Sequence, residues 1–383
     1  MKGSLVIFLS FLLLSPLAGQ LDQTPFLNNL KIQKSDLGKL YLGLENYNLY
    51  KNNEYFNNIQ PGFTIFGSAI NASVKYYPSE VFLIEAGIHL LTYYGTGKFD
   101  QVTPIIRVNY QPFRNCNVII GNIYGGLNHG FIEPLYQFER FFEDTPETGL
   151  QLLYKSSHID TDLYIDWRKY IYRNSYNDNE IFTFGWVSKG KIFKKEKPLQ
   201  IEIPFQILVS HKGGQVDTTN LPTESLLNLA TGISISYRFN SFISEVGASF
   251  YYASYQDISE KKEQLFDSGY GVYPLVYAKS KWLNLYLGYW NASQFIGPLG
   301  EPLFSSVSYI DKNLAFPKRE LILFKFDFRY NITRGLFIGV RYEGYYDILG
   351  TNINENISQY DFSFGVYINF TRDFFLTDIK KIK

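Results

Sequence analysis

Beyond its first twenty residues, this sequence has almost no cysteine, no long apolar run and no excess charge of either sign. The single cysteine, Cys116, cannot form an internal disulfide bond. Lysine plus arginine and aspartate plus glutamate each number 36, and this balance disfavours nucleic acid as a partner. No later apolar run reaches the roughly 20 residues with which a helix crosses a bilayer. A disulfide scaffold, a nucleic-acid-binding protein and a helical membrane protein are therefore all disfavoured.

The first residues have the three parts of a secretory signal peptide. Lys2 gives a basic start, the apolar run that follows ends at Leu14, and the small residues Ala18 and Gly19 come next. We therefore predict a signal peptide over 1–19. The chain is expected to be exported.

Alternation of apolar and polar residues recurs along the rest of the chain. In "YDFSFGVYINF", 360–370, every even position is apolar, and the odd positions are mostly polar. The segment 199–209, "LQIEIPFQILV", alternates in the same way. A period of two residues is the signature of a strand with one apolar face.

The length of these segments distinguishes a membrane protein from a soluble one. Most run for about ten to fourteen residues, whereas strands of soluble proteins are usually about 5–6 residues long. A tilted strand needs roughly 9–11 residues to cross a membrane. Aromatic residues make up 18% of the chain, as is typical of barrels with aromatic belts at both membrane surfaces. The fold class predicted is all-β, a transmembrane antiparallel up-and-down β-barrel.

Turn residues and breaks in the alternation predict sixteen strands. They are 38–48, 62–76, 81–93, 101–112, 117–125, 148–157, 160–170, 180–192, 199–210, 228–238, 242–255, 269–279, 282–292, 319–330, 335–346 and 357–370. Fourteen strands are the alternative, if 38–48 or 117–125 does not cross. The barrel must close, because an open strand edge cannot be satisfied in hydrocarbon.

The predicted connections alternate between short and long. Connections after even-numbered strands are short and those after odd-numbered strands are longer, which matches short periplasmic turns and long extracellular loops. An even number of strands places both chain ends in the periplasm. The expected organisation is a periplasmic segment 20–37, a barrel 38–370 and a periplasmic tail 371–383.

On these features the chain resembles the porin-like outer-membrane β-barrels of Gram-negative bacteria. The resemblance covers nearly the whole chain after 1–19 and includes the strand ending at Phe370, which is similar to the terminal strand of such barrels. The chain departs from the pattern because "TRDFFLTDIKKIK" follows that strand. No motif indicates a subfamily. The resemblance implies a location in the outer membrane and a role in transport.

The third long loop, 126–147, is the main candidate site. Porin-like barrels commonly fold this loop into the lumen, so the resemblance implies a pore constriction here, and a cap pointing outward is the alternative. The proposed constriction residues are Asn128, His129, Glu133, Glu139, Arg140 and Glu143. Charged residues on inward faces, which set solute preference in channels, are Lys325, Asp327, Arg329, Arg341 and Glu343.

No arrangement of residues predicts catalysis or metal binding. One histidine, His129, with the carboxylates of Glu133 and Glu139 is too few for a zinc site. Phosphate-binding loops and nucleophile elbows are absent from the sequence. We therefore predict no enzyme activity, no cofactor and no metal. The short repeat "EPLY" at 133–136 and "EPLF" at 301–304 is compatible with chance, and no site is predicted from it.

The leading functional hypothesis is a channel for passive diffusion of small hydrophilic solutes. The alternative is a non-enzymatic accessory subunit of an outer-membrane assembly, secretion or uptake complex. A third hypothesis, an outer-membrane protease or lipase, is disfavoured because the sequence has no recognisable catalytic site. The expected partners are outer-membrane lipids and small hydrophilic solutes, with either a homo-oligomer or an outer-membrane protein complex. No nucleic acid is expected as a partner.

Overall fold

The computed structural model describes residues 32, 34–172, 179–194, 196–214, 222–351 and 359–379. The expected signal peptide, 1–19, lies outside the described residues, as do most of 20–37 and the last four residues of the chain. The periplasmic placement of both ends of the chain stays a prediction.

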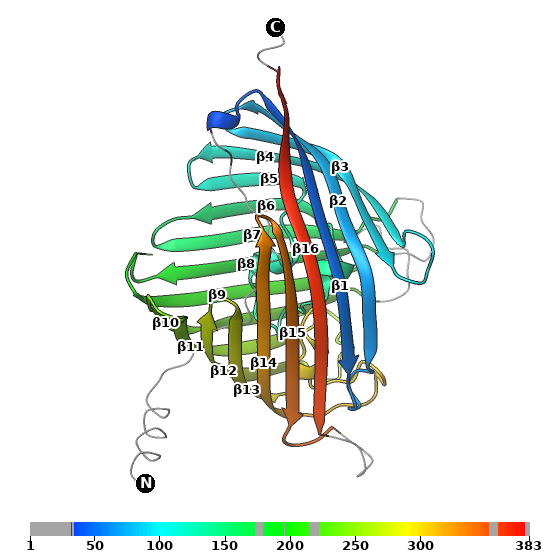
Figure 1. Cartoon of the computed structure of the whole chain (residues 1–383). Coiled ribbons are helices and arrows are strands. Elements are labelled where there is room, and N and C mark those ends of the chain that lie inside the picture. The colour runs from blue at the N-terminus through cyan, green and yellow to red at the C-terminus, as the bar shows by residue number, and fades with distance from the viewer. Residues whose placement is uncertain are drawn as a thin grey trace.

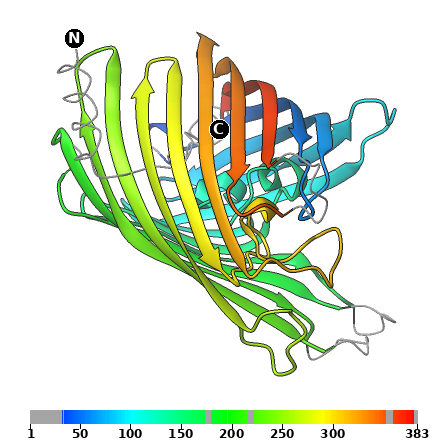
Figure 2. The ribbon, with the colours of Figure 1, turned by 90° about the horizontal axis from the view of Figure 1, so that it is seen from below.

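Sixteen strands form one closed antiparallel barrel in which each strand pairs with its neighbours in sequence and β1 pairs with β16. Figures 1 and 2 show this wall from two directions, with β16 lying beside β1. The strands are β1 (Lys39–Glu54), β2 (Phe63–Ser79), β3 (Phe82–Tyr93), β4 (Gln101–Phe113), β5 (Cys116–Asn122), β6 (Thr148–Lys155), β7 (Ile159–Lys169), β8 (Ile181–Lys191), β9 (Leu199–Lys212), β10 (Glu224–Arg238), β11 (Ile243–Asp257), β12 (Ser268–Ser280), β13 (Leu283–Ser293), β14 (Lys318–Thr333), β15 (Leu336–Asp347) and β16 (Tyr360–Asp378).

This topology confirms the predicted fold class and the count of sixteen strands. Two strands extend well beyond their predicted ends: β1 continues to Glu54 instead of 48, and β16 continues to Asp378 instead of 370. The two extensions have the same cause, because the whole of β1 pairs with β16, from Lys39 with Asp378 to Glu54 with Phe362.

The alternation of the sequence becomes a difference between the two faces of the wall. On β14, Phe324 and Phe328 are exposed on the outer face, whereas Lys325 and Asp327 between them are buried inside. An apolar outer face suits lipid, and polar inner positions suit an interior with its own polar partners. Among the described residues, no helix combines the length and apolar character needed to cross a membrane.

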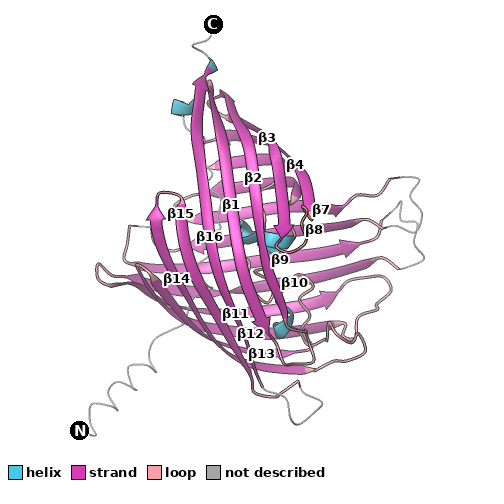
Figure 3. Ribbon diagram, turned by 45° about the vertical axis from the view of Figure 1, so that its right-hand side comes forward, coloured by secondary structure: helices cyan, strands magenta, loops and turns pink. Residues whose placement is uncertain are grey.

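Helical structure in the described ranges is limited to short turns (Figure 3). These are η2 (Lys34–Asp36), η3 (Gly126–His129), α2 (Arg140–Glu143) and η4 (Pro302–Phe304). The last three belong to two long connections, 123–147 and 294–317, which we call the first and second inner loops. Both leave the same end of the barrel, which we call the long-loop end.

The two inner loops meet inside the barrel. The Gln137 N–H donates to the Leu299 carbonyl at 2.8 Å, and the Glu301 N–H donates to the Glu133 carbonyl at 2.9 Å. A Cβ at Gly300 would collide with the Pro134 carbonyl, so only glycine allows this close approach. The repeated Glu-Pro-Leu segments are thus in direct contact.

Apolar side chains of the inner loops form a core within the barrel. Phe131, Leu135, Phe295 and Phe304 are all buried in one cluster with side chains of the wall. Trp290 of β13 is also in this cluster, and its indole N–H donates to the Phe304 carbonyl at 3.0 Å. The interior therefore has a packed core at the level of these loops.

Candidate functional site

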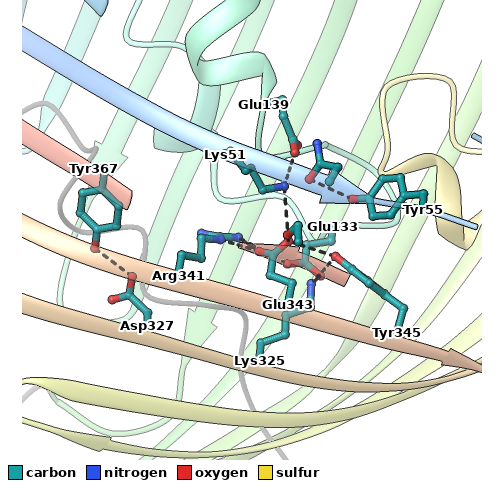
Figure 4. A network of polar contacts seen from close by, with 12 residues as sticks. Lys51, Tyr55, Glu133, Glu139, Lys325, Asp327, Arg341, Glu343, Tyr345 and Tyr367 are labelled. Carbon is teal, nitrogen blue, oxygen red and sulfur yellow. Dashed lines mark hydrogen bonds and ion pairs between the residues drawn. The ribbon is translucent and has the colours of Figure 1, made fainter. Parts of the chain in front are cut away.

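A buried ionic network joins the first inner loop to three strands of the wall (Figure 4). Three cations belong to the wall: Lys51 on β1, Lys325 on β14 and Arg341 on β15. Lys51 pairs with Glu139 of the loop, and its Nζ lies 3.6 Å from a Glu343 carboxylate oxygen of β15. Lys325 Nζ donates to Glu133 Oε2 of the loop at 2.6 Å, and Arg341 pairs with Glu343.

Tyrosine hydroxyls and an aromatic ring complete this network. The Tyr273 hydroxyl donates to Glu133 Oε2 at 3.1 Å, and Lys325 Nζ donates to the Tyr345 hydroxyl at 2.9 Å. The Arg341 guanidinium lies 3.8 Å from the centre of the Phe138 ring. The paired side chains are no more than 7% exposed. Such a network fixes the loop in place, because a buried charge is tolerated only when it is paired.

The structure brings together only part of the predicted site. Five predicted residues belong to the ionic network: Glu133, Glu139, Lys325, Arg341 and Glu343. The other six lie outside the ion pairs of this network. Asn128 donates to the Gly125 carbonyl, and His129 lies in a second cluster with Asp162 and Glu147. Arg140 lies beside Asp144, and Glu143 is exposed. Asp327 is directly opposite Arg341 and accepts a hydrogen bond from the Tyr367 hydroxyl at 2.8 Å, and Arg329 is half-buried. Whether these residues constrict a pore stays a prediction.

Glu301 of the second inner loop lies in the same charged interior. Its side chain is 5% exposed, and its Oε1 has no hydrogen-bond partner among the described residues. Burial, together with the nearby charge of Glu139, raises the pKa of Glu301 to about 8, although Lys51 opposes this shift. At neutral pH this carboxyl is therefore mostly protonated.

His129 is clamped between two carboxylates. Its Nδ1 lies 2.8 Å from Asp162 Oδ2, and its Nε2 lies 2.8 Å from Glu147 Oε2. The ring stacks on Tyr164, with ring centres 3.6 Å apart. Burial alone would lower the pKa of His129, but the charges of Asp162 and Glu147 outweigh it and raise the pKa to about 10. A cation with both ring nitrogens occupied and no exposed surface cannot act as a general base.

A small polar cavity of about 70 Å³ lies between the first inner loop and β1 to β4. His89 and Asn71 line it, and His89 Nδ1 lies 2.7 Å from Asn71 Oδ1. His89 Nε2 has no partner among the described residues. The cavity is large enough for a few water molecules and too small for a lipid.

A different polar cluster lies on the outer face of the wall at the long-loop end. His211 near the end of β9 is directly opposite Ser225 near the start of β10. His211 Nδ1 lies 2.7 Å from Ser225 Oγ, and His211 Nε2 lies 2.7 Å from the Gly213 carbonyl oxygen. Both side chains are half-buried. They point outward, because the neighbouring Leu208 and Leu226 are buried on the inner face.

A groove of about 360 Å³ runs along the outer face beside this pair. Its floor includes one row of paired residues across four strands: Leu229, Ser254, Tyr270 and Ser293. Leu227, two residues after Ser225 on the same face of β10, also lines the groove. We call Ser225 and His211 the rim pair and this depression the wall groove.

The interpretation of the sequence missed the rim pair, because 211–227 was expected to be a loop. In the structure, β9 continues to Lys212 and β10 begins at Glu224. The interpretation also missed Lys51, since the first strand was expected to end at 48. In the sequence, the only signal for the rim pair or for Lys51 would have been a polar residue that continues the alternating pattern of a strand.

Within the described ranges, no group of three or more His, Cys, Asp and Glu side chains has the arrangement of a metal site.

Solved structures with the same barrel are outer-membrane proteins. OprD from Pseudomonas aeruginosa is 10% identical, with a TM-score of 0.51, and the match covers 91% of this chain and 98% of that one. OccK5 (OpdH) from Pseudomonas aeruginosa is 10% identical, with a TM-score of 0.50, and the match covers 88% of this chain and 99% of that one. These likenesses concern the fold and confirm a porin-like barrel of the outer membrane. No curated protein matches the sequence.

A family model described as lipid A 3'-O-deacylase-type matches residues 32–379. The match spans the whole barrel. The family is named for an enzyme activity, so the prediction that this protein is not an enzyme is wrong.

Proposed function

Because the chain belongs to the lipid A 3'-O-deacylase-type family, we propose that it hydrolyses an ester-linked acyl chain of lipid A in the outer membrane. The observation that carries the proposal is the family match over residues 32–379. The closed barrel supports it, because a barrel wall holds an enzyme at the depth of its lipid substrate.

The arrangement of polar groups favours chemistry at the outer wall over chemistry in the interior. The cations of the ionic network are paired with buried carboxylates, and His129 is enclosed. In outer-membrane barrels the longer loops are extracellular, so the long-loop end faces the outer leaflet. The ester bonds of a lipid lie where its headgroup meets its acyl chains. The rim pair and the wall groove are at that level.

The test is incubation of the purified full-length protein with lipid A in mixed micelles, followed by mass spectrometry. We expect lipid A to lose the mass of one acyl chain, with the free fatty acid appearing in equal amount. Heat-denatured protein is the control. Lipid A of unchanged mass after prolonged incubation with the folded barrel would contradict the proposal.

A second candidate function is passive diffusion of small hydrophilic solutes, with 126–147 as the constriction. The charged residues on inward faces favour it, since rings of charge set selectivity in channels. In planar bilayers the channel hypothesis expects discrete conductance steps, which increase when 130–145 is deleted. Absence of conductance from both the wild type and the deletion variant would refute it.

A further inference from the structure

We propose that this protein forms a two-fold symmetric homodimer in the membrane, and that the two copies meet through polar side chains on the outer face around β1. These side chains are Asn46, Asn48, Ser68 and Tyr94, which hydrogen bonds join into one group that we call the outer polar stripe. The inference goes beyond the proposed deacylation and does not depend on it. Figure 1 shows β16, β1 and β2 as neighbours on one side of the barrel.

The two asparagines of the outer polar stripe point away from the interior. Tyr47 and Leu49 of β1 are buried inside the barrel, so Asn46 and Asn48, which alternate with them along the strand, face outward. Ile368 of β16 lies directly opposite Asn48 and is 42% exposed on the same face. Asparagine therefore stands where the wall otherwise presents apolar side chains to lipid.

These asparagines lie within the apolar band of the wall and not at its edge. Asn46 and Asn48 are the eighth and tenth of the sixteen residues of β1. Phe66, nearer the long-loop end, and Leu42, nearer the other end, are exposed by 50% and 39%. An amide in hydrocarbon costs free energy unless its polar groups are paired. Polar groups at this depth are therefore expected to have partners.

Hydrogen bonds within the stripe orient the amides without using all of their polar groups. Asn46 Nδ2 donates to Ser68 Oγ at 2.8 Å, and Asn48 Nδ2 donates to Asn46 Oδ1 at 2.5 Å. Asn48 Oδ1 accepts a hydrogen bond from the Tyr94 hydroxyl at 3.1 Å. An amide has two donor protons and two acceptor lone pairs. No acceptor among the described residues takes the second amide proton of Asn46.

A second copy of this chain is the partner that fits the unused groups. All copies of a barrel cross the outer membrane in the same orientation, so a two-fold axis along the membrane normal brings residues of equal depth face to face. An amide both donates and accepts hydrogen bonds, so Asn46 and Asn48 are complementary to the same residues in another copy. An acyl chain at this depth offers no polar group, and the stripe carries no charge that would call for a charged partner.

The outer face around the stripe is large enough for a stable contact. Four neighbouring strands, β16, β1, β2 and β3, are about 19 Å wide, since strands lie about 4.8 Å apart. From Leu42 to Tyr50 the face is about 26 Å long, at about 3.3 Å per residue. The product is about 500 Å² per copy, so the two copies together reach the roughly 1,000 Å² that a specific interface needs.

The test measures dimer formation by the full-length protein in phospholipid vesicles. Copies carry a donor or an acceptor fluorophore at Lys312→Cys in a Cys116→Ala background, since Lys312 is exposed in the second inner loop. Energy transfer at falling protein-to-lipid ratios gives the dissociation constant of the dimer. We expect the double variant Asn46→Leu/Asn48→Leu to raise this constant about tenfold or more, because it removes hydrogen bonds between the copies in hydrocarbon.

Asn291→Leu is the matched control. Asn291 is exposed on the outer face of β13, four strands from β1, and its replacement should change the dissociation constant less than about twofold. Leucine suits a position that faces lipid, so every variant is expected to fold. Heat-modifiable mobility on gels verifies that each variant forms a barrel.

Disulfide trapping in the membrane tests which face makes the contact. In the Cys116→Ala background, the Ile70→Cys substitution places a thiol on β2 directly opposite Asn46. The control substitution is Phe205→Cys, because Phe205 is 36% exposed on the outer face of β9, eight strands from β1 in either direction round the barrel. We expect oxidation to give covalent dimers of the Ile70→Cys variant and only monomers of the Phe205→Cys variant.

Each remaining outcome overturns the inference. A wild type that is monomeric at every protein-to-lipid ratio excludes the dimer, and equal dissociation constants for the wild type and the double variant exclude the stripe as its contact. Covalent dimers of the Phe205→Cys variant alone would place the contact on the opposite wall. A lipid that native mass spectrometry finds on the monomeric wild type but not on the double variant would assign the stripe to a lipid headgroup. None of these measurements uses lipid A, so the proposed deacylation stands or falls separately.

Discussion

The interior of the barrel and its long-loop rim use the same residue types in opposite ways. In the interior, both ring nitrogens of His129 meet carboxylates, and the ring has no exposed surface. At the rim, His211 meets a carbonyl on one side and a serine hydroxyl on the other, and it is half-buried. The first arrangement holds a permanent charge and fixes a loop. The second places the ring between two uncharged oxygen atoms.

Ion pairs show the same contrast. Lys325 and Glu133 pair at 2.6 Å with side chains 4% and 7% exposed, whereas Lys261 and Glu263 pair at 2.8 Å with side chains 71% and 48% exposed. Similar distances do not imply similar energies, because water screens the exposed pair and not the buried one. Removing a single charged side chain is therefore expected to lower the free energy of unfolding strongly in the interior and only slightly at the rim.

The largest expected effect is the loss of a buried carboxylate, Glu133→Ala. Lys325 would keep the Tyr345 hydroxyl as a partner but lose its carboxylate. Removing one member of a buried pair costs about 3–5 kcal/mol. We expect a fall of that size in the free energy of unfolding in detergent, and faster cleavage of the first inner loop by thermolysin.

Glu143→Ala is the matched control in the same loop. Glu143 is exposed, and the one hydrogen bond of its side chain among the described residues is a long one of 3.4 Å, accepted by its carboxylate from the Tyr93 hydroxyl. Its removal should change the free energy of unfolding by less than about 0.5 kcal/mol. Equal effects of the two variants would show that the ionic network does not stabilise the loop.

A smaller and pH-dependent effect is expected for His129→Gln. The pKa of His129 is raised from 6.5 to about 10, so its stabilisation is complete below pH 6.5 and is lost as pH rises toward 10. We expect the variant to lose roughly 1–3 kcal/mol at pH 6 and much less at pH 10. Thermal unfolding followed by circular dichroism measures both values.

The Glu301→Gln variant separates the loss of stability caused by deprotonation of His129 from a second loss of stability at alkaline pH. The pKa of Glu301 is raised from 4.5 to about 8, so its ionisation also weakens the fold as pH rises from 4.5 to 8. The Gln variant removes this part and should keep the His129 dependence up to pH 10. If the stability of the wild type stayed constant from pH 6.5 to 10, the pairing of His129 with Asp162 and Glu147 would not stabilise the fold as expected.

The fold could be predicted from the sequence because lipid imposes a local pattern. At 360–370, an apolar residue at every second position follows directly from a wall with lipid on one side, and each short turn marks a hairpin. Strand ends were less predictable. Near the long-loop end the strands leave the hydrocarbon, the apolar pattern stops, and β9 nevertheless continues through His211 to Lys212.

The sites could not be predicted because they depend on register and on loop packing. His211 and Ser225 are fourteen residues apart in the chain and meet only because β9 and β10 pair with these residues opposite each other. Glu133 and Lys325 are separated by 192 residues, and no sequence pattern connects a loop residue with one distant strand. The Glu-Pro-Leu repeat was a true signal of contact between the inner loops, but four residues carry too little information to recognise it.

The smallest expected effect is that of Glu263→Ala at the rim. Lys261 and Glu263 lie in the connection between β11 and β12, and both are exposed. Exposed pairs contribute about 0–1 kcal/mol, so the free energy of unfolding should change by less than about 0.5 kcal/mol and ester hydrolysis should stay within about twofold of the wild type. A loss above 1 kcal/mol in the unfolding measurement would mean that this rim is shielded from water. It would then differ from the interior only in degree.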